Sequence, residues 1–341
     1  MVGEKGMPEG KRILVTGGAG FMGSWLVDEL LKRGHEVISV DDLSGGFRHN
    51  VSRGCRFIKA DIRDPKMCNR ITKNIDVIYH LAAYAAEGQS FFSPIRINDI
   101  NITPMNNLLV AAVNNDIKRF VYTSSMAVYG NQNPPFDEDM PRMPEDPYGC
   151  AKAYCENMLE IFSRVYELQY VILRPHNIYG PRQNISDPFR NVLGIWINRI
   201  MRGKPPYIYG DGKQTRAFSY VGDVTPAIAD AGLLERASGQ IINVGSHEVV
   251  SIDKACRIVL ETMESDLEPI YLEQRPGEVK HAYCTTRKSE ELLGYKTLHT
   301  LRDGVGKMVE WAKKAGPQKP TYRVPLEITK KAPPAWKEKL I

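Results

Sequence analysis

A tyrosine and a lysine stand four residues apart in Tyr148-Gly-Cys-Ala-Lys152. The surrounding stretch 147–168 predicts a helix, and at this spacing both side chains leave the same helix face. A phenol of pKa about 10 is a poor base at neutral pH, and lowering that pKa by about 3 units requires roughly 4 kcal/mol. An ammonium about 4 Å away in a partly screened site supplies that free energy. The pair therefore predicts a proton shuttle in which Lys152 lowers the pKa of Tyr148.

The spacing alone does not distinguish this interpretation from a simpler one. The same spacing occurs at Tyr209 and Lys213, but Gly210 and Gly212 between them exclude a helix there. Taken in isolation, a tyrosine on a helix surface explains Tyr148 equally well. The interpretation as a proton shuttle therefore depends on the residues that accompany the pair.

One such residue is a serine that follows the strand-like run 119–124. Ser125 should lie at the sheet edge where that strand ends, facing the same cleft as Tyr148. Its hydroxyl would hold a substrate oxygen while the phenol moves the proton. The serine, the tyrosine and the lysine together predict a catalytic site.

A glycine-rich turn near the N-terminus joins a short apolar run to a helical segment. Gly17, Gly20 and Gly23 are spaced Gly-x-x-Gly-x-x-Gly, and the predicted helix begins at Phe21-Met22. Glycines at this spacing let a pyrophosphate approach the backbone at a helix N-terminus. We expect a dinucleotide site that includes all five residues. The alternative is a glycine turn that serves packing only.

Acidic residues after the next two strands predict which dinucleotide binds. Asp41 ends the second strand and is placed to accept hydrogen bonds from the adenosine ribose, and Asp42 adds a second negative charge. Both carboxylates would repel a 2′-phosphate, so NAD is favoured over NADP. Asp61, followed by Ile62, comes after the third strand. It is either an adenine contact or a cap of the next helix.

Apolar runs and helical segments alternate through the first half of the chain. After Pro175 this alternation breaks down, although 240–244 predicts another buried strand and 252–264 a helix. Buried strands alternating with helices predict an α/β fold with a doubly wound, Rossmann-type parallel sheet covered on both faces. The expected strands are 12–16, 36–40, 56–59, 76–81, 119–124 and 170–174, and the expected helices lie near 21–33, 65–72, 94–115 and 147–168.

The change in character after Pro175 predicts two interleaved lobes with a cleft at the carboxyl ends of the strands. We expect an NAD-binding domain, a smaller substrate-binding lobe and a Pro-rich basic tail. Their ranges are 1–178 joined by about 225–264, then 179–224 with 265–316, and finally 317–341.

Composition excludes several classes of function. The chain has 341 residues, 43% hydrophobic and 25% charged, and a net charge of +5, most of which lies in the tail. We therefore expect no nucleic-acid partner, and the tail should wrap the surface or a partner subunit. No apolar run reaches the length of a membrane span, and the six cysteines lack metal-site spacing. We expect a cytoplasmic protein with reduced thiols, no membrane contact and no metal.

Together these motifs resemble the extended short-chain dehydrogenase/reductase family, specifically its nucleotide-sugar epimerase branch, from about Lys11 to Trp311. The resemblance implies that Ser125, Tyr148 and Lys152 are catalytic and that Lys152 also binds the nicotinamide ribose. It implies further cofactor contacts at Leu81, Ala82, Ala83, Asn101 and Pro175.

The second half carries residues that the resemblance assigns to a UDP-sugar. Asn177 would bind the diphosphate–sugar region, Tyr207 and Tyr209 would line the pyrimidine, and Arg216 and Arg275 would neutralise the diphosphate. Surface ion pairs are the alternative for the two arginines.

One further position bears on the size of the sugar. By resemblance, Ala282 falls where the family sets the width of the sugar pocket, and a small residue there leaves room for an N-acetyl group. The alternative is a core residue, with Tyr283 filling the space.

The resemblance implies NAD-dependent epimerisation at C4 of a UDP-hexose through a 4-keto intermediate, in a homodimer. The expected substrates are UDP-glucose and UDP-galactose, with UDP-N-acetylhexosamines tolerated. Met126 and Ala127 stand where dehydrating relatives carry an Asp-Glu pair, and neither can transfer a proton. Two alternatives remain: another NAD-dependent nucleotide-sugar epimerase or reductase, and a non-catalytic NAD-binding protein.

Overall fold

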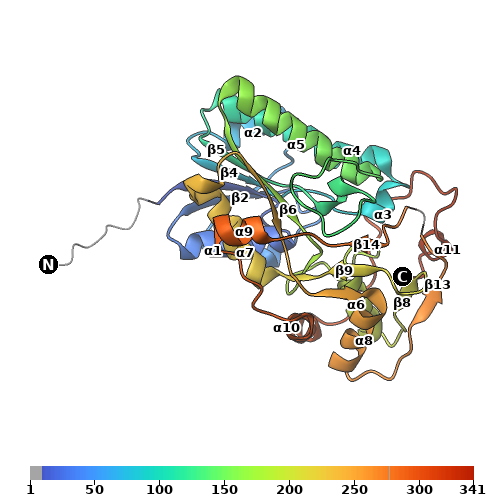
Figure 1. Ribbon diagram of the computed structural model, residues 1–341. Helices are drawn as coiled ribbons and strands as arrows, with labels where there is room; N and C mark the ends of the chain where they lie inside the picture. The colour runs from blue at the N-terminus through green and yellow to red at the C-terminus, as the bar shows by residue number, and fades with distance from the viewer. Residues whose placement is uncertain (1–9, 276) are drawn as a thin grey trace.

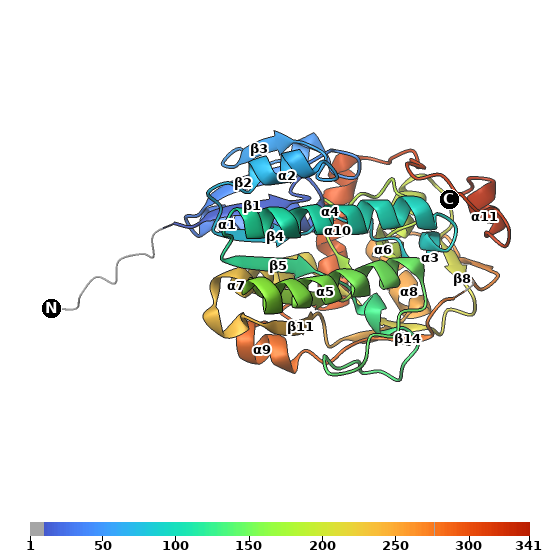
Figure 2. The same cartoon turned by 90° about the horizontal axis from the view of Figure 1, so that it is seen from above.

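The central feature of the protein is a seven-stranded sheet with the order β11-β6-β5-β4-β1-β2-β3. The structure is a computed structural model that describes residues 10–275 and 277–341. Every neighbouring pair in this sheet is parallel, and the strands that Figure 2 labels follow that order, from β11 at the bottom to β3 at the top. The strands are β1 (Arg12–Thr16), β2 (Glu36–Asp41), β3 (Arg56–Lys59), β4 (Val77–His80), β5 (Arg119–Thr123), β6 (Gln169–Pro175) and β11 (Gln240–Val244).

Helices cover both faces of the sheet, as Figure 1 shows. Successive residues of β1 point to opposite faces, so Ile13 and Val15 pack into one core cluster and Leu14 into the other. The predicted doubly wound parallel sheet is thus confirmed. One face carries α1 (Phe21–Lys32) and α7 (Val221–Leu233), and the other carries α2 (Pro65–Ile71), α4 (Pro94–Asn114) and α5 (Pro147–Tyr166).

A smaller lobe lies beyond the carboxyl ends of the strands. Three helices pack together in it: α6 (Val192–Met201), α8 (Ile252–Thr262) and α10 (Leu301–Ala315). The helix expected at 252–264 is therefore present, but it packs in this lobe and not on the main sheet. Small sheets complete the lobe, formed by β8 (Tyr207–Tyr209) with β13 (Ile270–Leu272) and by β9 (Thr215–Ala217) between β12 (Val249–Ser251) and β14 (His281–Ala282).

Short elements join these parts. They are the strand pair β7 (Ile178–Tyr179) and β10 (Ser219–Tyr220), the helices α3 (Glu87–Ser90), α9 (Arg287–Leu293) and α11 (Pro334–Lys337), and the 3-10 helices η1 (Arg48–Asn50), η2 (Met126–Tyr129) and η3 (Glu235–Ala237). None of the helices in the described part of the chain is long and apolar enough to cross a membrane.

The Pro-rich tail 317–341 lies on the surface of its own chain. Gln89 donates to the carbonyl oxygen of Val324 at 2.8 Å, and Ser93 donates to that of Pro325 at 2.8 Å. Both donors lie in or beside α3, next to the cavity described below. The tail therefore ends near the carboxyl edge of the sheet, where Figure 1 shows α11.

Candidate active site

A cavity of about 490 Å³ lies between the carboxyl edge of the sheet and the smaller lobe. The strand order reverses between β1 and β4, and open α/β sheets bind ligands at such a switch point. Most residues predicted to form the site line this cavity: Gly17, Gly20, Phe21, Met22, Gly23, Asp41, Asp42, Asp61, Ile62, Leu81, Ala82, Ala83, Ser125, Tyr148, Lys152, Pro175, Asn177, Tyr207, Tyr209, Arg216 and Arg275.

The glycine turn forms one end of the cavity. Gly17 has φ +74°, and a Cβ atom on it would lie 2.8 Å from the backbone nitrogen of Ala82. A Cβ atom on Gly23 would lie 2.1 Å from the carbonyl oxygen of Gly17, so neither position accepts a larger residue. No side chain caps the start of α1 at Gly20. The N–H groups of the first turn are therefore available to a phosphate group, so this end fits a dinucleotide.

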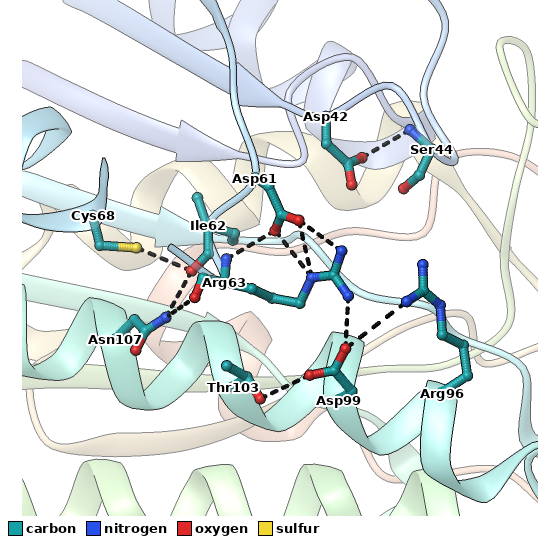
Figure 3. Close-up of polar contacts among 10 residues, drawn as sticks. All are labelled: Asp42, Ser44, Asp61, Ile62, Arg63, Cys68, Arg96, Asp99, Thr103 and Asn107. Atoms are coloured by element: carbon teal, nitrogen blue, oxygen red, sulfur yellow. Dashed lines mark hydrogen bonds and ion pairs between the residues drawn. The ribbon is translucent and has the colours of Figure 1, made fainter. Parts of the chain in front are cut away.

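Asp41 and Asp42 lie beside this turn. Asp41 accepts hydrogen bonds from the backbone N–H groups of Ala19 at 3.1 Å and Leu43 at 2.8 Å, and Asp42 accepts one from Ser44 at 2.8 Å (Figure 3). Burial raises the pKa of Asp41, and its backbone hydrogen bonds oppose that shift. Carboxylate oxygens fixed in this way keep lone pairs for ribose hydroxyls.

The third acidic residue, Asp61, lines the cavity and forms an ion pair. Asp61 pairs with Arg63 at 2.6 Å, and Arg63 also pairs with Asp99 at 2.6 Å (Figure 3). The cap of α2 is Asp64, which accepts a hydrogen bond from the N–H of Lys66, so the capping role expected for Asp61 is wrong. Because Asp61 and Asp99 neutralise the charge of Arg63, this arginine does not provide a free positive charge that could bind the 2′-phosphate of NADP.

The three residues predicted to be catalytic meet at the carboxyl end of β5. Tyr148 is the second residue of α5 and is 4% exposed, and Lys152 lies one turn further along the same helix face. The ammonium of Lys152 donates to the carbonyl oxygen of Thr123 at 2.7 Å. Ser125 caps η2 by accepting a hydrogen bond from Ala127 at 3.1 Å. All three side chains face the cavity.

The protonation of the pair differs from the prediction. Burial raises the pKa of the Tyr148 phenol, the negative charge of Glu87 raises it further, and the Ser125 hydroxyl only partly opposes this shift. Burial also lowers the pKa of Lys152 to about 8. The prediction that Lys152 alone lowers the pKa of Tyr148 is therefore wrong, because desolvation of the buried phenol outweighs one lysine charge.

At the other end of the cavity, two arginines converge on one acid. Arg275 donates to Glu278 at 2.9 Å and lies 4.9 Å above the ring of Tyr209. Arg216 lies 3.9 Å from the same carboxylate and donates to the carbonyl oxygen of Val279 at 2.7 Å. The two arginines share a single ion-paired carboxylate, that of Glu278, so their guanidinium groups can still bind an anionic ligand.

Two predicted site residues do not line the cavity. Asn101 is buried, accepts a hydrogen bond from the N–H of Tyr84 at 3.0 Å and donates to the Tyr84 carbonyl oxygen at 3.3 Å. It therefore holds the loop after β4 in place and does not face the cofactor end directly. Ala282 is 5% exposed and packs in a cluster that includes Met126 and Cys284, which is the core role left open as its alternative.

Three other cavity residues were not predicted. Glu87 begins α3, Arg190 pairs with Asp187 at 2.8 Å and lies 4.5 Å above the ring of Tyr84, and Trp336 comes from the tail. Glu87 stands only a few residues after the predicted cofactor loop 81–83, so its place in the sequence could have predicted that it lines the cavity. Arg190 and Trp336 have no local motif that marks them.

Glu87 makes no side-chain hydrogen bond or ion pair within the described ranges. Its side chain is exposed, yet protein surrounds it, because it faces the interior of the cavity. Burial and the charge of Asp146 together raise the pKa of Glu87 to about 7, although Arg216 and Arg275 oppose the shift. The cavity thus contains a titratable carboxyl group beside Tyr148.

Comparison with known proteins agrees with this arrangement. Residues 13–245 match the NAD dependent epimerase/dehydratase family, and the chain belongs to that family. The expected nucleotide-sugar epimerase branch is thereby confirmed. The protein is an enzyme whose cofactor is NAD, and the glycine turn, the uncapped start of α1 and Asp41 fit this cofactor.

Similar solved structures bind different UDP-sugars. A UDP-glucose 4-epimerase from Thermotoga maritima, solved with UDP-glucose, is 35% identical, with 89% of this chain and 99% of that chain covered and a TM-score of 0.85. A UDP-N-acetylglucosamine 4-epimerase from Methanobrevibacter ruminantium, in complex with UDP-N-acetylmuramic acid, is 34% identical, with 90% and 99% covered and a TM-score of 0.84. A UDP-glucuronic acid 4-epimerase from Bacillus cereus, in complex with UDP-glucuronic acid and NAD, is 29% identical, with 89% and 99% covered and a TM-score of 0.84.

Proposed function

We propose that this protein interconverts the C4 epimers of a UDP-hexose, UDP-glucose and UDP-galactose, through a 4-keto intermediate. One observation carries the proposal: Ser125, Tyr148 and Lys152 share a single cavity with Arg216 and Arg275. Arginines that bind the diphosphate would place the hexose between themselves and Tyr148. Tyr148 would then lie at the reacting carbon, and Arg216 and Arg275 would lie at the anionic diphosphate.

Each residue of the catalytic site has a different role in the proposed reaction. NAD, held by the glycine turn and Asp41, would supply the hydride acceptor and donor for C4. Tyr148 takes the proton from the C4 hydroxyl and later gives it back, while Ser125 holds the same oxygen. Lys152 is fixed by Thr123, and Arg190 opposes the raised pKa of the buried phenol, so these two cations stabilise the phenolate.

Charge in the cavity supports a neutral hexose over a uronic acid. The charge of Glu87 acts on Tyr148 and also on Arg216 and Arg275, so this carboxyl group lies along the stretch that the hexose would occupy. A carboxylate at C6 of the sugar would meet a second acid there, and like charges placed together cost several kcal/mol. We keep UDP-N-acetylhexosamines in the proposal, since a similar solved enzyme acts on UDP-N-acetylglucosamine.

We assign the cavity residues to ligands on the same basis. The cofactor would contact Gly17, Gly20, Phe21, Met22, Gly23, Asp41, Asp42, Asp61, Ile62, Leu81, Ala82, Ala83, Tyr148, Lys152 and Pro175, and the substrate would contact Ser125, Tyr148, Asn177, Tyr207, Tyr209, Arg216 and Arg275.

We also propose the division into two lobes, with α8 moved from the NAD-binding domain to the substrate-binding lobe. The NAD-binding domain would comprise 10–178 with 225–251, because β11 pairs with β6 in the main sheet, and residues 1–9 of the expected range lie outside the described residues. The substrate-binding lobe would comprise 179–224 and 252–316, because α8 packs against α6 and α10. The tail 317–341 would stand apart from both.

A homodimer through α4 and α5 is a further part of the proposal. These helices lie side by side on one face (Figure 2), and their outer surfaces expose large apolar side chains. The exposed residues are Val110, Tyr154, Ile161, Val165 and Tyr166. In a twofold dimer, this apolar face of one copy would pack against the same face of the other copy. The cysteines are free thiols, which supports a reducing, cytoplasmic setting.

The fate of NAD separates epimerisation from the alternative, a reductase. An epimerase restores NAD in every cycle, whereas a reductase consumes reduced cofactor. The purified protein should therefore contain NAD and should convert many equivalents of UDP-glucose without any added cofactor. Turnover that requires added NADH, with one NADH oxidised per product, would identify a reductase and overturn the proposal.

A further inference from the structure

The tail 317–341 is bonded near both of its ends to the smaller lobe. Near its start, the N–H of Gln318 donates to the side chain of Asn198 at 2.8 Å. Near its end, Arg199 donates to the carbonyl oxygen of Leu340 at 2.9 Å. Asn198 and Arg199 both lie in α6. The tail thus begins and finishes beside the same helix, and Figure 2 shows its course from α10 to α11.

Between these two points the tail bonds to the NAD-binding domain. The carboxylate of Glu327 accepts hydrogen bonds from the N–H groups of Ile95 at 2.9 Å and Arg96 at 2.8 Å, so it caps the start of α4. Gln89, which is fully buried, donates to the carbonyl oxygen of Val324 at 2.8 Å. The tail therefore bridges the two lobes, and any movement that separates them must break some of its contacts.

The middle of the tail also packs beside the catalytic tyrosine. Val324 is 5% exposed and belongs to a buried apolar cluster with Tyr84, Ile97 and Tyr148. The hydroxyl of Tyr84 donates to Gln89 at 2.9 Å, and Gln89 holds the Val324 carbonyl oxygen, so polar contacts fix the same cluster. The tail thus forms part of the wall behind the site.

One tail residue reaches the loop 43–47, which follows β2. The guanidinium of Arg323 donates to the carbonyl oxygen of Ser44 and lies 5.4 Å from the centre of the Phe47 ring. Two residues earlier, the N–H of Thr321 donates to a carbonyl oxygen of the smaller lobe, at residue 186, at 2.8 Å. This short piece of the tail therefore ties the loop to the smaller lobe.

The loop 43–47 lies directly on the glycine turn. The N–H of Phe47 donates to the carbonyl oxygen of Ala19 at 2.9 Å. A Cβ atom on Gly46 would lie 2.8 Å from the carbonyl carbon of Ala19 and 2.9 Å from Oδ1 of Asp41, so the loop is in close contact with both. Its last four residues line the cavity. Because the glycine turn and Asp41 are the groups that fit NAD, this loop borders the cofactor end of the cavity.

We propose that the tail is a strap that Arg323 closes over the cofactor end, so that NAD enters and leaves only when the strap opens. The loop that Arg323 holds borders the groups that fit NAD, and the strap joins the two lobes between which the cavity lies. One segment thus restrains both movements that would open the cavity. The strap acts on cofactor exchange, so the proposal goes beyond the proposed function and holds for any sugar substrate.

The test measures how fast the full chain exchanges its NAD. Protein loaded with NAD is mixed with an excess of isotopically labelled NAD, and the bound cofactor is analysed by mass spectrometry over time. Arg323→Ala removes the guanidinium that holds Ser44, and Arg323 is exposed, so the variant should fold. Exchange should be at least about 10-fold faster than in the wild type, which equals about 1.4 kcal/mol in the barrier. An unchanged exchange rate overturns the proposal.

Lys319→Ala is the matched control. It removes another positive charge from the same exposed stretch of the tail. The side chain of Lys319 forms no hydrogen bond or ion pair with any residue that the structure describes, so the exchange rate of this variant should equal that of the wild type. If Lys319→Ala exchanges NAD as fast as Arg323→Ala, the charge of the tail controls exchange and the strap does not.

The rate of NAD binding separates a strap from a contact that only stabilises the bound cofactor. A strap slows passage in both directions, so cofactor-free Arg323→Ala should also bind NAD faster, by a similar factor. Stopped-flow fluorescence can follow this binding, because Trp196 and Trp336 line the cavity. Faster release with an unchanged rate of binding would mean that Arg323 affects affinity alone, and this result also overturns the proposal. Neither rate depends on a sugar, so the proposed function is tested separately.

Discussion

The ammonium of Lys152 lies 5.7 Å from the centre of the Tyr148 ring. Its hydrogen bond goes to the carbonyl oxygen of Thr123 at 2.7 Å, so β5 fixes the position of the charge. Lys152 therefore acts on the phenol through space, from a place that the sheet determines. A mobile lysine on a helix surface would not give the phenol a constant electrostatic environment.

Replacing the phenol tests the proton shuttle. Tyr148→Phe removes the base and should lower kcat by at least about 100-fold, in line with typical general acid–base contributions. Retained NAD, measured by absorbance after denaturation, should not change because the glycine turn and Asp41 are untouched. Near wild-type turnover in this variant would show that another group moves the proton.

Replacing Asp41 tests cofactor selection. Asp41→Asn should weaken NAD binding and narrow the difference between NAD and NADP, because the variant no longer repels a 2′-phosphate. Both dissociation constants can be measured by calorimetry after removal of the retained cofactor. Asp266→Asn, at an exposed site outside the cavity lining, is the control. Binding of NADP to the wild type as tight as that of NAD would contradict the assignment.

Replacing Glu87 tests the selection of neutral sugars. Glu87→Gln keeps the shape of the side chain and removes the carboxyl group that a uronic acid would meet. The ratio of kcat/KM for UDP-glucuronate to that for UDP-glucose should rise by at least about 10-fold. An unchanged ratio would mean that Glu87 does not face the C6 substituent.

The raised pKa of Glu87 also predicts how the stability of Glu87→Gln depends on pH. Burial raises the pKa of Glu87 to about 7, so the folded protein keeps a proton that the unfolded chain releases above its ordinary pKa of 4.5. Stability contributed by this group is therefore present below about pH 4.5 and is lost as pH rises to about 7.

Glu87→Gln should accordingly be more stable than the wild type at pH 8, and this difference should shrink toward pH 4.5. Urea unfolding at the two pH values measures it. Glu268→Gln, at an exposed residue, should show no such dependence. A difference that is the same at both pH values would rule out the raised pKa.

Enlarging Ala282 tests the corrected position of that residue. Ala282→Tyr would overpack the cluster around Met126 and Cys284 and should cost about 1–3 kcal/mol in the free energy of unfolding. The ratio of activity on UDP-N-acetylglucosamine to that on UDP-glucose should stay constant. A selective loss of the N-acetylated substrate would show that Ala282 reaches the sugar after all.

Local signals explain what the sequence could predict. The run from β1 through Gly17 to α1, and the helix that carries Tyr148 and Lys152, depend on nearby residues, so pattern and spacing are sufficient for them. Trp336 and Arg190 reach the cavity only through tertiary packing, and no motif surrounds them. The raised pKa of Tyr148 was missed for the same reason, because desolvation depends on burial by distant segments and not on the position of Lys152.

The most direct test of the account is to incubate the purified protein with UDP-glucose alone and follow the sugar by NMR. We predict that UDP-galactose appears without added NAD and that the two epimers reach the same mixture from either side. The account would be contradicted if UDP-glucose and UDP-N-acetylglucosamine both remained unchanged while NAD stayed bound to the protein.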